Sequence, residues 1–248
     1  MNSFLTLWRK EFGNYFISPI AYTALSFFLA IMGLIFFFLV NVLAEGTPGT
    51  GVMNLVFGSP FYWMTLILII PLLTMRLFAE EKRTGTIEVL LTAPISDTAI
   101  VAAKFAGVFT FYILMWLPTV VFVMVLQQFS AETPPIDPGV LTACYVGVLL
   151  SGAFFISLGM VCSILTSNQI TAAITCFALM IAVLFSGLAE TMTFNSFALS
   201  LANMVSPHQH LSEYSRGIID TRSVIFYMSG TFFFLFTATR LLESRQWK

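Results

Sequence analysis

The sequence predicts an all-α protein that crosses a membrane several times, and three observations lead to this fold class. Charged residues make up only 9% of the 248 positions, whereas an average soluble domain has about 25%. Hydrophobic residues make up 58%, and the mean hydropathy is +0.92. The apolar residues form long continuous runs. In lipid such runs are helices, because every backbone amide must find its partner within its own segment.

Six apolar runs are long enough to span a bilayer core, which takes about 20 helical residues. They cover residues 20–44, 60–78, 100–126, 140–165, 169–188 and 223–242. The first run is too long for the core of a signal peptide, so we expect it to remain in the mature protein. We therefore divide the chain into an N-terminal segment, residues 1–18, and a six-helix transmembrane domain, residues 19–248.

The segment 1–18 is too charged to cross a membrane. Phe4, Trp8, Phe12 and Phe16 recur every four residues and would form one apolar stripe along a helix. Polar and basic residues occupy other positions round the helix. This pattern predicts an amphipathic helix that lies in the membrane interface.

The distribution of Lys and Arg predicts the orientation of the spans. If the N-terminus is cytoplasmic, nine of the eleven basic residues fall on the cytoplasmic side, and only Arg216 and Arg222 fall outside. The positive-inside rule therefore places both termini in the cytoplasm. The nine cytoplasmic residues are Arg9, Lys10, Arg76, Lys82, Arg83, Lys104, Arg240, Arg245 and Lys248.

The segment 78–94, FAEEKRTGTIEVLLTAP, holds five of the few charged residues of the chain. The second span is expected to continue into it. Lys82 and Arg83 suit the last turn of a helix, where the dipole favours positive charge. Gly85 can supply the left-handed residue that ends the helix.

A very short amphipathic helix is expected after Gly85. Ile87, Leu90 and Leu91 are spaced i, i+3, i+4 and would form one apolar face, and Pro94 would end the helix. An ordinary solvated loop is the alternative, but such a loop would leave these bulky apolar side chains in water. The pattern favours a segment that docks onto a partner.

The sequence AEEKRTGTIEVLLTAPIS, followed by Lys104 in IVAAKFAG, resembles the signature of ABC-2-type permeases. These are the membrane subunits of one class of ATP-binding-cassette exporters. WRKEFGNYFISPIAY resembles the interfacial elbow helix of the family, and YSRGIIDTRSVIFY resembles the segment before its last helix. The resemblance covers the whole chain and is closest to the gliding-motility-associated (GldF-like) and NosY-like branch.

The resemblance implies further features of the fold and its location. They are a cytoplasmic coupling helix that contacts an ATPase subunit, re-entrant helices before the last span, and a place in the bacterial cytoplasmic (inner) membrane. Carried over by position, the contact with the ATPase would include Glu80, Glu81, Lys82, Arg83, Gly85, Thr86, Ile87, Glu88, Leu90, Leu91, Arg9, Lys10 and Glu11.

The chain has no G-x-x-x-x-G-K-[ST] phosphate loop. We therefore expect no enzymatic activity, cofactor or metal in this chain, with ATP and Mg bound by a separate ABC ATPase subunit. The resemblance also implies a second permease subunit, identical or paralogous, and allows a periplasmic partner. Nucleic acid is not an expected partner, because the net charge is −1.

The predicted function is that of a permease subunit in an ATP-driven exporter. One alternative is a permease that transmits motion to a periplasmic partner, and another is a proton-coupled secondary transporter. No Asp, Glu or His lies near the middle of a predicted span. Because ion-coupled carriers usually need such a group, its absence from the sequence argues against the last alternative. The sequence does not indicate the cargo.

Gly147, Ser151, Gly159 and Ser163 lie on one line of the fourth predicted span, at spacings that are multiples of four. Small residues at this spacing let helices approach closely. The contact could lie within one subunit or between two subunits.

Cys144, Cys162 and Cys176 lie in apolar runs, and their number and spacing predict neither a disulfide framework nor a zinc site. His208 and His210 fall in a polar segment, where we expect solvated side chains.

Overall fold

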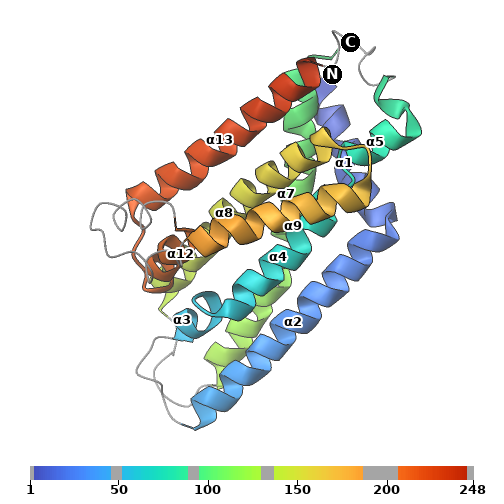
Figure 1. Cartoon of the computed structure of the whole chain (residues 1–248). Helices are drawn as coiled ribbons and strands as arrows, with labels where there is room; N and C mark the ends of the chain where they lie inside the picture. Colours follow the sequence, from blue (N-terminus) through green and yellow to red (C-terminus); the bar gives the residue numbers. More distant parts are fainter. Residues whose placement is uncertain (1–2, 46–51, 89–94, 130–136, 187–205, 245–248) are drawn as a thin grey trace.

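The computed structural model describes residues 3–45, 52–88, 95–129, 137–186 and 206–244. Over these residues all regular structure is helical, which confirms the predicted all-α class (Figure 1). The helices are α1 (Ser3–Ile17), α2 (Pro19–Ala44), α3 (Val52–Phe57), α4 (Pro60–Thr74), α5 (Ala79–Thr84), α7 (Asp97–Phe129), α8 (Pro138–Leu165), α9 (Gln169–Ser186), α12 (Pro207–Ser215) and α13 (Thr221–Glu243).

Several helices begin with residues that suit a first turn. Proline occupies the first turn of α2, α4, α8 and α12, where its missing N–H would have no helical partner. Asp137 and Asp220 cap α8 and α13, because each carboxylate accepts a hydrogen bond from the backbone N–H two residues later.

Five helical stretches are long and apolar enough to cross a membrane: α2, residues 60–84, α7, α8 and α13. The predicted multi-pass membrane protein is thereby confirmed. The predicted span 169–188 corresponds to α9, which is apolar but shorter than the other five. Its 18 described residues reach about 27 Å at 1.5 Å per residue, just below the hydrocarbon thickness of about 30 Å. The count of six spans stays a prediction.

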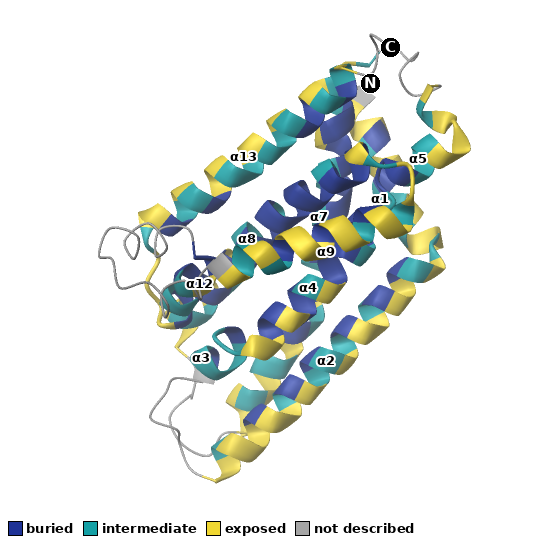
Figure 2. Ribbon diagram, in the orientation of Figure 1, coloured by how far each residue is buried: buried dark blue, intermediate teal, exposed yellow. Residues whose placement is uncertain are grey.

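Helix α8 forms the centre of the bundle. In the most apolar 18-residue stretch of α8, 72% of the residues are buried. In the corresponding stretches of α2 and α13, 22% and 17% of the residues are buried. Helix α8 contacts α4, α7, α9, α12 and α13. Figure 2 shows the same contrast, with α8 largely dark blue and broad exposed faces on α2 and α13. Since exposed residues on the two outer helices include many large apolar side chains, these faces suit contact with lipid.

The line of small residues on α8 packs within the subunit. A Cβ at Gly147 would lie 2.7 Å from a ring carbon of Tyr214, and a Cβ at Gly159 would clash with Thr74. The hydroxyl of Ser151 lies 3.0 Å from the Tyr62 hydroxyl. Of the two alternatives left open by the sequence, contact inside one subunit is therefore the one observed.

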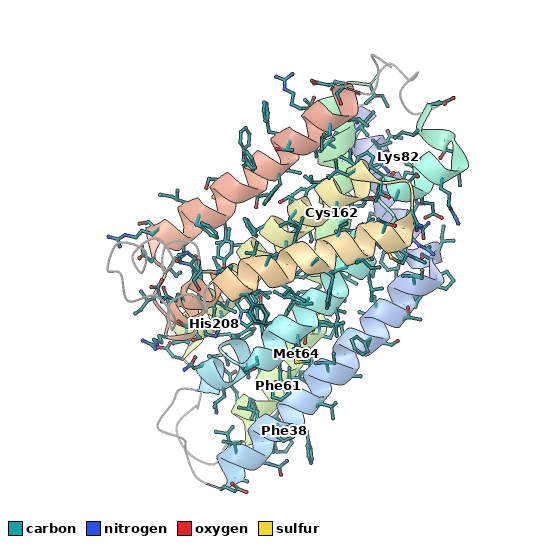
Figure 3. All side chains as sticks on the ribbon, viewed as in Figure 1. Phe38, Phe61, Met64, Lys82, Cys162 and His208 are labelled. Atoms are coloured by element: carbon teal, nitrogen blue, oxygen red, sulfur yellow. The ribbon has the colours of Figure 1, made fainter. Side chains whose placement is uncertain are left out.

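The segment before the last span differs from the sequence expectation. His208 and His210 were expected to be solvated in a loop, but they lie on α12. His210 is buried with its Nδ1 2.7 Å from the hydroxyl of Ser223, and His208 stacks on Trp63 (Figure 3). His208 is exposed, as expected, whereas the burial of His210 differs from the expectation because its ring packs against Phe226 and Tyr227 of α13. Residues 187–205, where other re-entrant helices were expected, lie outside the described residues.

Helix α1 begins and helix α13 ends at the end of the bundle where α5 lies, while α3 and α12 lie at the opposite end (Figure 1). This arrangement agrees with the predicted placement of both termini and the segment after the second span on one side of the membrane. Which side this is stays a prediction.

Candidate functional site: an ion-pair cluster at the α5 end

Lys104 joins three helices at the α5 end of the bundle. Its side chain projects from the second turn of α7 and is almost fully buried, with 1% of the residue exposed. The ammonium nitrogen lies 3.0 Å from Glu11 Oε1 of α1 and 2.7 Å from Glu81 Oε1 of α5. It also lies 5.1 Å from the ring centroid of Phe78, within the range of a cation–π interaction.

The cluster holds its members together because each charge is costly to bury alone. An ammonium removed from water loses several kcal/mol of hydration, and only close opposite charges with hydrogen bonds recover this loss. Lys104 has two such carboxylates, Glu11 and Glu81. Moving α1 or α5 away from α7 would therefore expose a buried charge to water or leave it without its ion-pair partner.

Helix α1 packs along α7 through a face that overlaps only part of the predicted stripe. Leu7 and Glu11 are buried, whereas Phe4 and Phe16 of the stripe are exposed. The helix itself forms as predicted, within residues 1–18. Trp8 and Phe12 of the stripe pack against the core, and Phe16 contacts Phe111 of α7 edge to face. The position of the helix in the membrane interface stays a prediction.

Close contacts fix α1 in this position. A Cβ at Gly107 of α7 would lie 2.9 Å from Glu11 Cβ, so only glycine allows this approach without displacing α1. The indole N–H of Trp8 donates to Thr110 Oγ1 at 3.2 Å. The hydroxyl of Tyr15 donates to the backbone carbonyl of Leu73 at 2.9 Å.

The Tyr15 hydroxyl remains a donor at physiological pH. Burial, together with the negative charge of Glu11, raises its pKa well above the ordinary value. The hydrogen bond to Leu73 therefore links α1 to α4. The bond from Trp8 to Thr110 links α1 to α7.

Helices α4 and α5 are separated by a turn at residues 75–78, where the sequence predicted one continuous helix. Ser163 of α8 bridges the turn. Its hydroxyl accepts from the backbone N–H groups of Phe78 and Ala79, each at 3.1 Å, and donates to the carbonyl of Met75 at 3.2 Å. These bonds replace helical bonds that the turn removes, which makes the break stable inside the protein.

The end of α5 agrees with the prediction. Lys82 and Arg83 occupy its last turn, and Gly85 adopts a left-handed conformation with φ of 74°. Residues 86–88 are again helical. Leu90, Leu91 and Pro94 of the predicted short helix lie outside the described residues.

The residues predicted for a partner interface fall into two groups. One group is exposed at the surface: Arg9, Lys10, Arg83, Gly85, Thr86 and Glu88. The second group is partly or fully buried. In it Glu11 and Glu81 contact Lys104, and Ile87 packs against the apolar core. Glu80 and Lys82 are half-buried on α5, and Figure 3 marks Lys82 there.

Sequence reasoning missed the roles of Lys104 and Ser163. Lys104 was noted as a cytoplasmic basic residue and as part of the family resemblance, but no ion pair was predicted for it. Its position four residues after Ile100, with alanines between, was a signal, because a charge inside an apolar run needs a partner. Ser163 was assigned only to helix packing, since its bonds depend on a break that the sequence did not predict.

A model of one protein family matches residues 40–241 and is described as ABC-2 family transporter protein. The matched range includes Glu81, Lys104 and Ser163, but it begins after α1 and Glu11. A search of curated proteins found no matching sequence.

Proposed function

Because the chain belongs to the ABC-2 family of transporter proteins, we propose that it is the transmembrane permease subunit of an ATP-driven exporter. Permeases of this family are membrane components of ABC transporters and work with an ABC ATPase subunit. Under this proposal ATP and Mg bind to that separate subunit. This chain couples hydrolysis there to the movement of a substrate across the membrane.

One observation carries the proposal: α5 is bonded to the bundle on two sides. Glu81 connects it to Lys104 of α7, and Ser163 of α8 bonds to its first residue, Ala79. A force on the exposed residues that follow α5 would therefore reach α7 and α8 through charged and hydrogen-bonded contacts. Through Lys104 and Glu11 it would also reach α1.

We assign different roles to the two groups of interface residues. The exposed residues Arg9, Lys10, Arg83, Thr86 and Glu88 would contact the ATPase directly. The buried carboxylates would instead transmit movement between helices. ATP binding can change the conformation only if the ATPase favours one arrangement of α5 over another.

The proposed topology places the α5 end in the cytoplasm and the α12 end outside. The assembly would contain two permease subunits and two ATPases in the bacterial inner membrane. Assignment to the gliding-motility-associated (GldF-like) and NosY-like branch stays a prediction that rests on the motif resemblance. The alternative is that the permease uses the same coupling to the ATPase to transmit motion to a periplasmic partner in place of exporting a substrate.

Affinity purification of the full chain from native membranes tests the proposal. We expect an ABC ATPase to copurify with it. The double charge reversal of Arg83→Glu and Glu88→Lys should reduce the captured ATPase at least tenfold, because both side chains are exposed and only partner contacts should change. Arg240→Glu is the control, since Arg240 is exposed at the same end but on α13.

Two results would contradict the proposal. One is an equal yield of ATPase with the double variant and with the wild type. The other is transport by the chain alone in vesicles without nucleotide, which would indicate a secondary transporter. Vesicle assays with candidate cargo distinguish export from mechanical transmission.

A further inference from the structure

A cavity of about 210 Å³ lies beside the ion-pair cluster, between α1, the start of α2 and the junction of α4 and α5. This volume is far above the ~10–15 Å³ that one water molecule needs. Its lining contains both apolar and polar side chains. The polar and charged residues are Glu11, Asn14, Tyr15, Ser18, Arg76, Glu80, Glu81 and Lys104. The apolar residues are Ile20, Ala21, Leu72, Leu73 and Leu77.

Two buried polar atoms of the lining are unsatisfied. Among the described residues, Arg76 Nε has no hydrogen-bond partner, and neither does Glu81 Oε2. Arg76 Nε lies 3.9 Å from Glu80 Oε2, which is an ion-pair distance and too long for a hydrogen bond. Both atoms have almost no accessible surface, so an occupant of the cavity would reach Arg76 and Glu81 through their other polar atoms.

The charges of the lining also do not balance. Glu11, Glu80 and Glu81 contribute three carboxylates, whereas Arg76 and Lys104 contribute two cations. Lys104 is already occupied by Glu11 and Glu81. An occupant with a cationic group that donates hydrogen bonds would complete the cavity near Glu80 and Glu81.

Arg76, which is ion-paired with Glu80, and Ser18 supply hydrogen-bond donors beside these carboxylates. A terminal guanidinium nitrogen of Arg76 donates to Ser18 Oγ at 3.3 Å, which leaves the Ser18 proton available to an acceptor. Arginine binds phosphate oxygens well because its planar donors match their geometry. The terminal guanidinium nitrogens of Arg76 and the Ser18 hydroxyl together suit a phosphodiester.

We infer that this cavity binds the headgroup of a phospholipid that carries a primary amine, such as phosphatidylethanolamine. The phosphodiester accepts from Arg76 and Ser18, and the ammonium donates to Glu80 and Glu81. The glycerol and the first acyl carbons lie against the apolar residues of the lining. The bound lipid would join α1 to the α4–α5 junction, next to the Lys104 cluster.

The chemistry of the cavity discriminates among lipids. Phosphatidylcholine carries a quaternary ammonium that cannot donate a hydrogen bond to a carboxylate. Phosphatidylglycerol has no cation, and its net negative charge would meet the excess carboxylate of the cavity. Soluble glycerophosphoethanolamine has the complete polar headgroup but lacks the acyl chains that the apolar residues would contact.

Native mass spectrometry of the delipidated full-length chain tests the inference by titration with these four compounds. We expect phosphatidylethanolamine to bind at least tenfold more tightly than each of the other three. Arg76→Gln and Glu80→Gln should each weaken its binding about tenfold or more, the loss expected for one charge-assisted hydrogen bond. Arg240→Gln is the matched control, because Arg240 forms an exposed ion pair with Glu243 beside a different hollow and should leave binding unchanged.

Several results would overturn the inference. Equal binding of phosphatidylethanolamine and phosphatidylcholine would remove the role of the amine, and tighter binding of phosphatidylglycerol would show an anion site. Equal binding of glycerophosphoethanolamine would identify a soluble ligand in place of a lipid. Unchanged binding in Glu80→Gln would place the lipid elsewhere. The comparison of lipids uses only the wild-type chain, so it stays decisive even if Arg76→Gln fails to fold.

Discussion

Lys104 is the residue on which the α5 end of the bundle depends most. Its ammonium is the cation that Glu11 and Glu81 share. Replacing a buried ion-paired group on one side leaves its partners buried and uncompensated, which usually costs more than the pair itself contributes. The effect of a change at Lys104 should therefore depend on whether the two carboxylates are changed as well.

We expect Lys104→Met to lower the free energy of unfolding by about 3–5 kcal/mol, because the buried carboxylate of Glu11 and the partly buried carboxylate of Glu81 lose their counter-charge. The triple variant Lys104→Met, Glu11→Gln, Glu81→Gln should recover part of this loss. Thermal unfolding in detergent measures both. Arg240→Gln, which breaks an exposed pair, should cost no more than about 1 kcal/mol. Equal stability of Lys104→Met and wild type would contradict the buried cluster.

The break between α4 and α5 is the element that positions the proposed coupling segment. Residues 75–78 leave the helical path, and Ser163 of α8 supplies the replacement bonds. Because these bonds come from the central helix, the direction of α5 is set by α8. The residues that follow Gly85 therefore keep a fixed relation to the core.

Replacing Ser163 by Ala should leave the N–H groups of Phe78 and Ala79 without their acceptor, at a cost of about 1–3 kcal/mol for each unsatisfied group. Hydrogen–deuterium exchange should rise in peptides that contain residues 75–84, with smaller changes elsewhere.

Ser157→Ala is the matched control for this prediction. Ser157 is equally buried on α8, but its hydroxyl donates only to the Phe154 carbonyl within its own helix. Unchanged exchange in Ser163→Ala, or the same increase in both variants, would show that α5 is not held by this contact.

At the scale of the whole molecule, the bundle gathers α5, the start of α1 and the end of α13 at one end and α12 at the other (Figure 1). The three cysteines of the chain are all buried. A new surface cysteine would therefore be the main site of labelling by a membrane-impermeant maleimide, which makes the topology testable without removing native cysteines.

We expect Arg222→Cys to be labelled in intact spheroplasts, because Arg222 is exposed at the α12 end and should face outward. Arg83→Cys should be labelled only after the membrane is permeabilised. The wild-type chain should show little labelling in either condition. Labelling of both variants from the same side would refute the proposed topology.

Much of the fold could be predicted because helices that cross a membrane need long apolar runs, which are easy to recognise in the sequence. The runs around 20–44 and 140–165 became α2 and α8 almost within their predicted limits. Gly85 ended its helix as expected, since a left-handed residue with no Cβ is a local property. Both features depend on composition or on one backbone conformation.

The site was harder to predict because it depends on contacts between distant segments. Glu11 and Lys104 are 93 positions apart, and Phe78 and Ser163 are 85 apart. The apolar stripe of residues 4–16 indicated a helix but did not reveal that the carboxylate of Glu11 is buried beside it. The burial of His210 was missed for the same reason, because it is created by α13, whereas His208 is exposed.

The separation of Glu11 from Lys104 also constrains how the protein is made. During synthesis α1 emerges first, yet the cation it binds belongs to the third membrane helix in chain order. Until that helix has left the ribosome and entered the bilayer, the carboxylate of Glu11 has only water and lipid headgroups around it. Docking of α1 against α7 can therefore occur only after α7 has been made, and a chain truncated before residue 104 should leave α1 accessible to added protease.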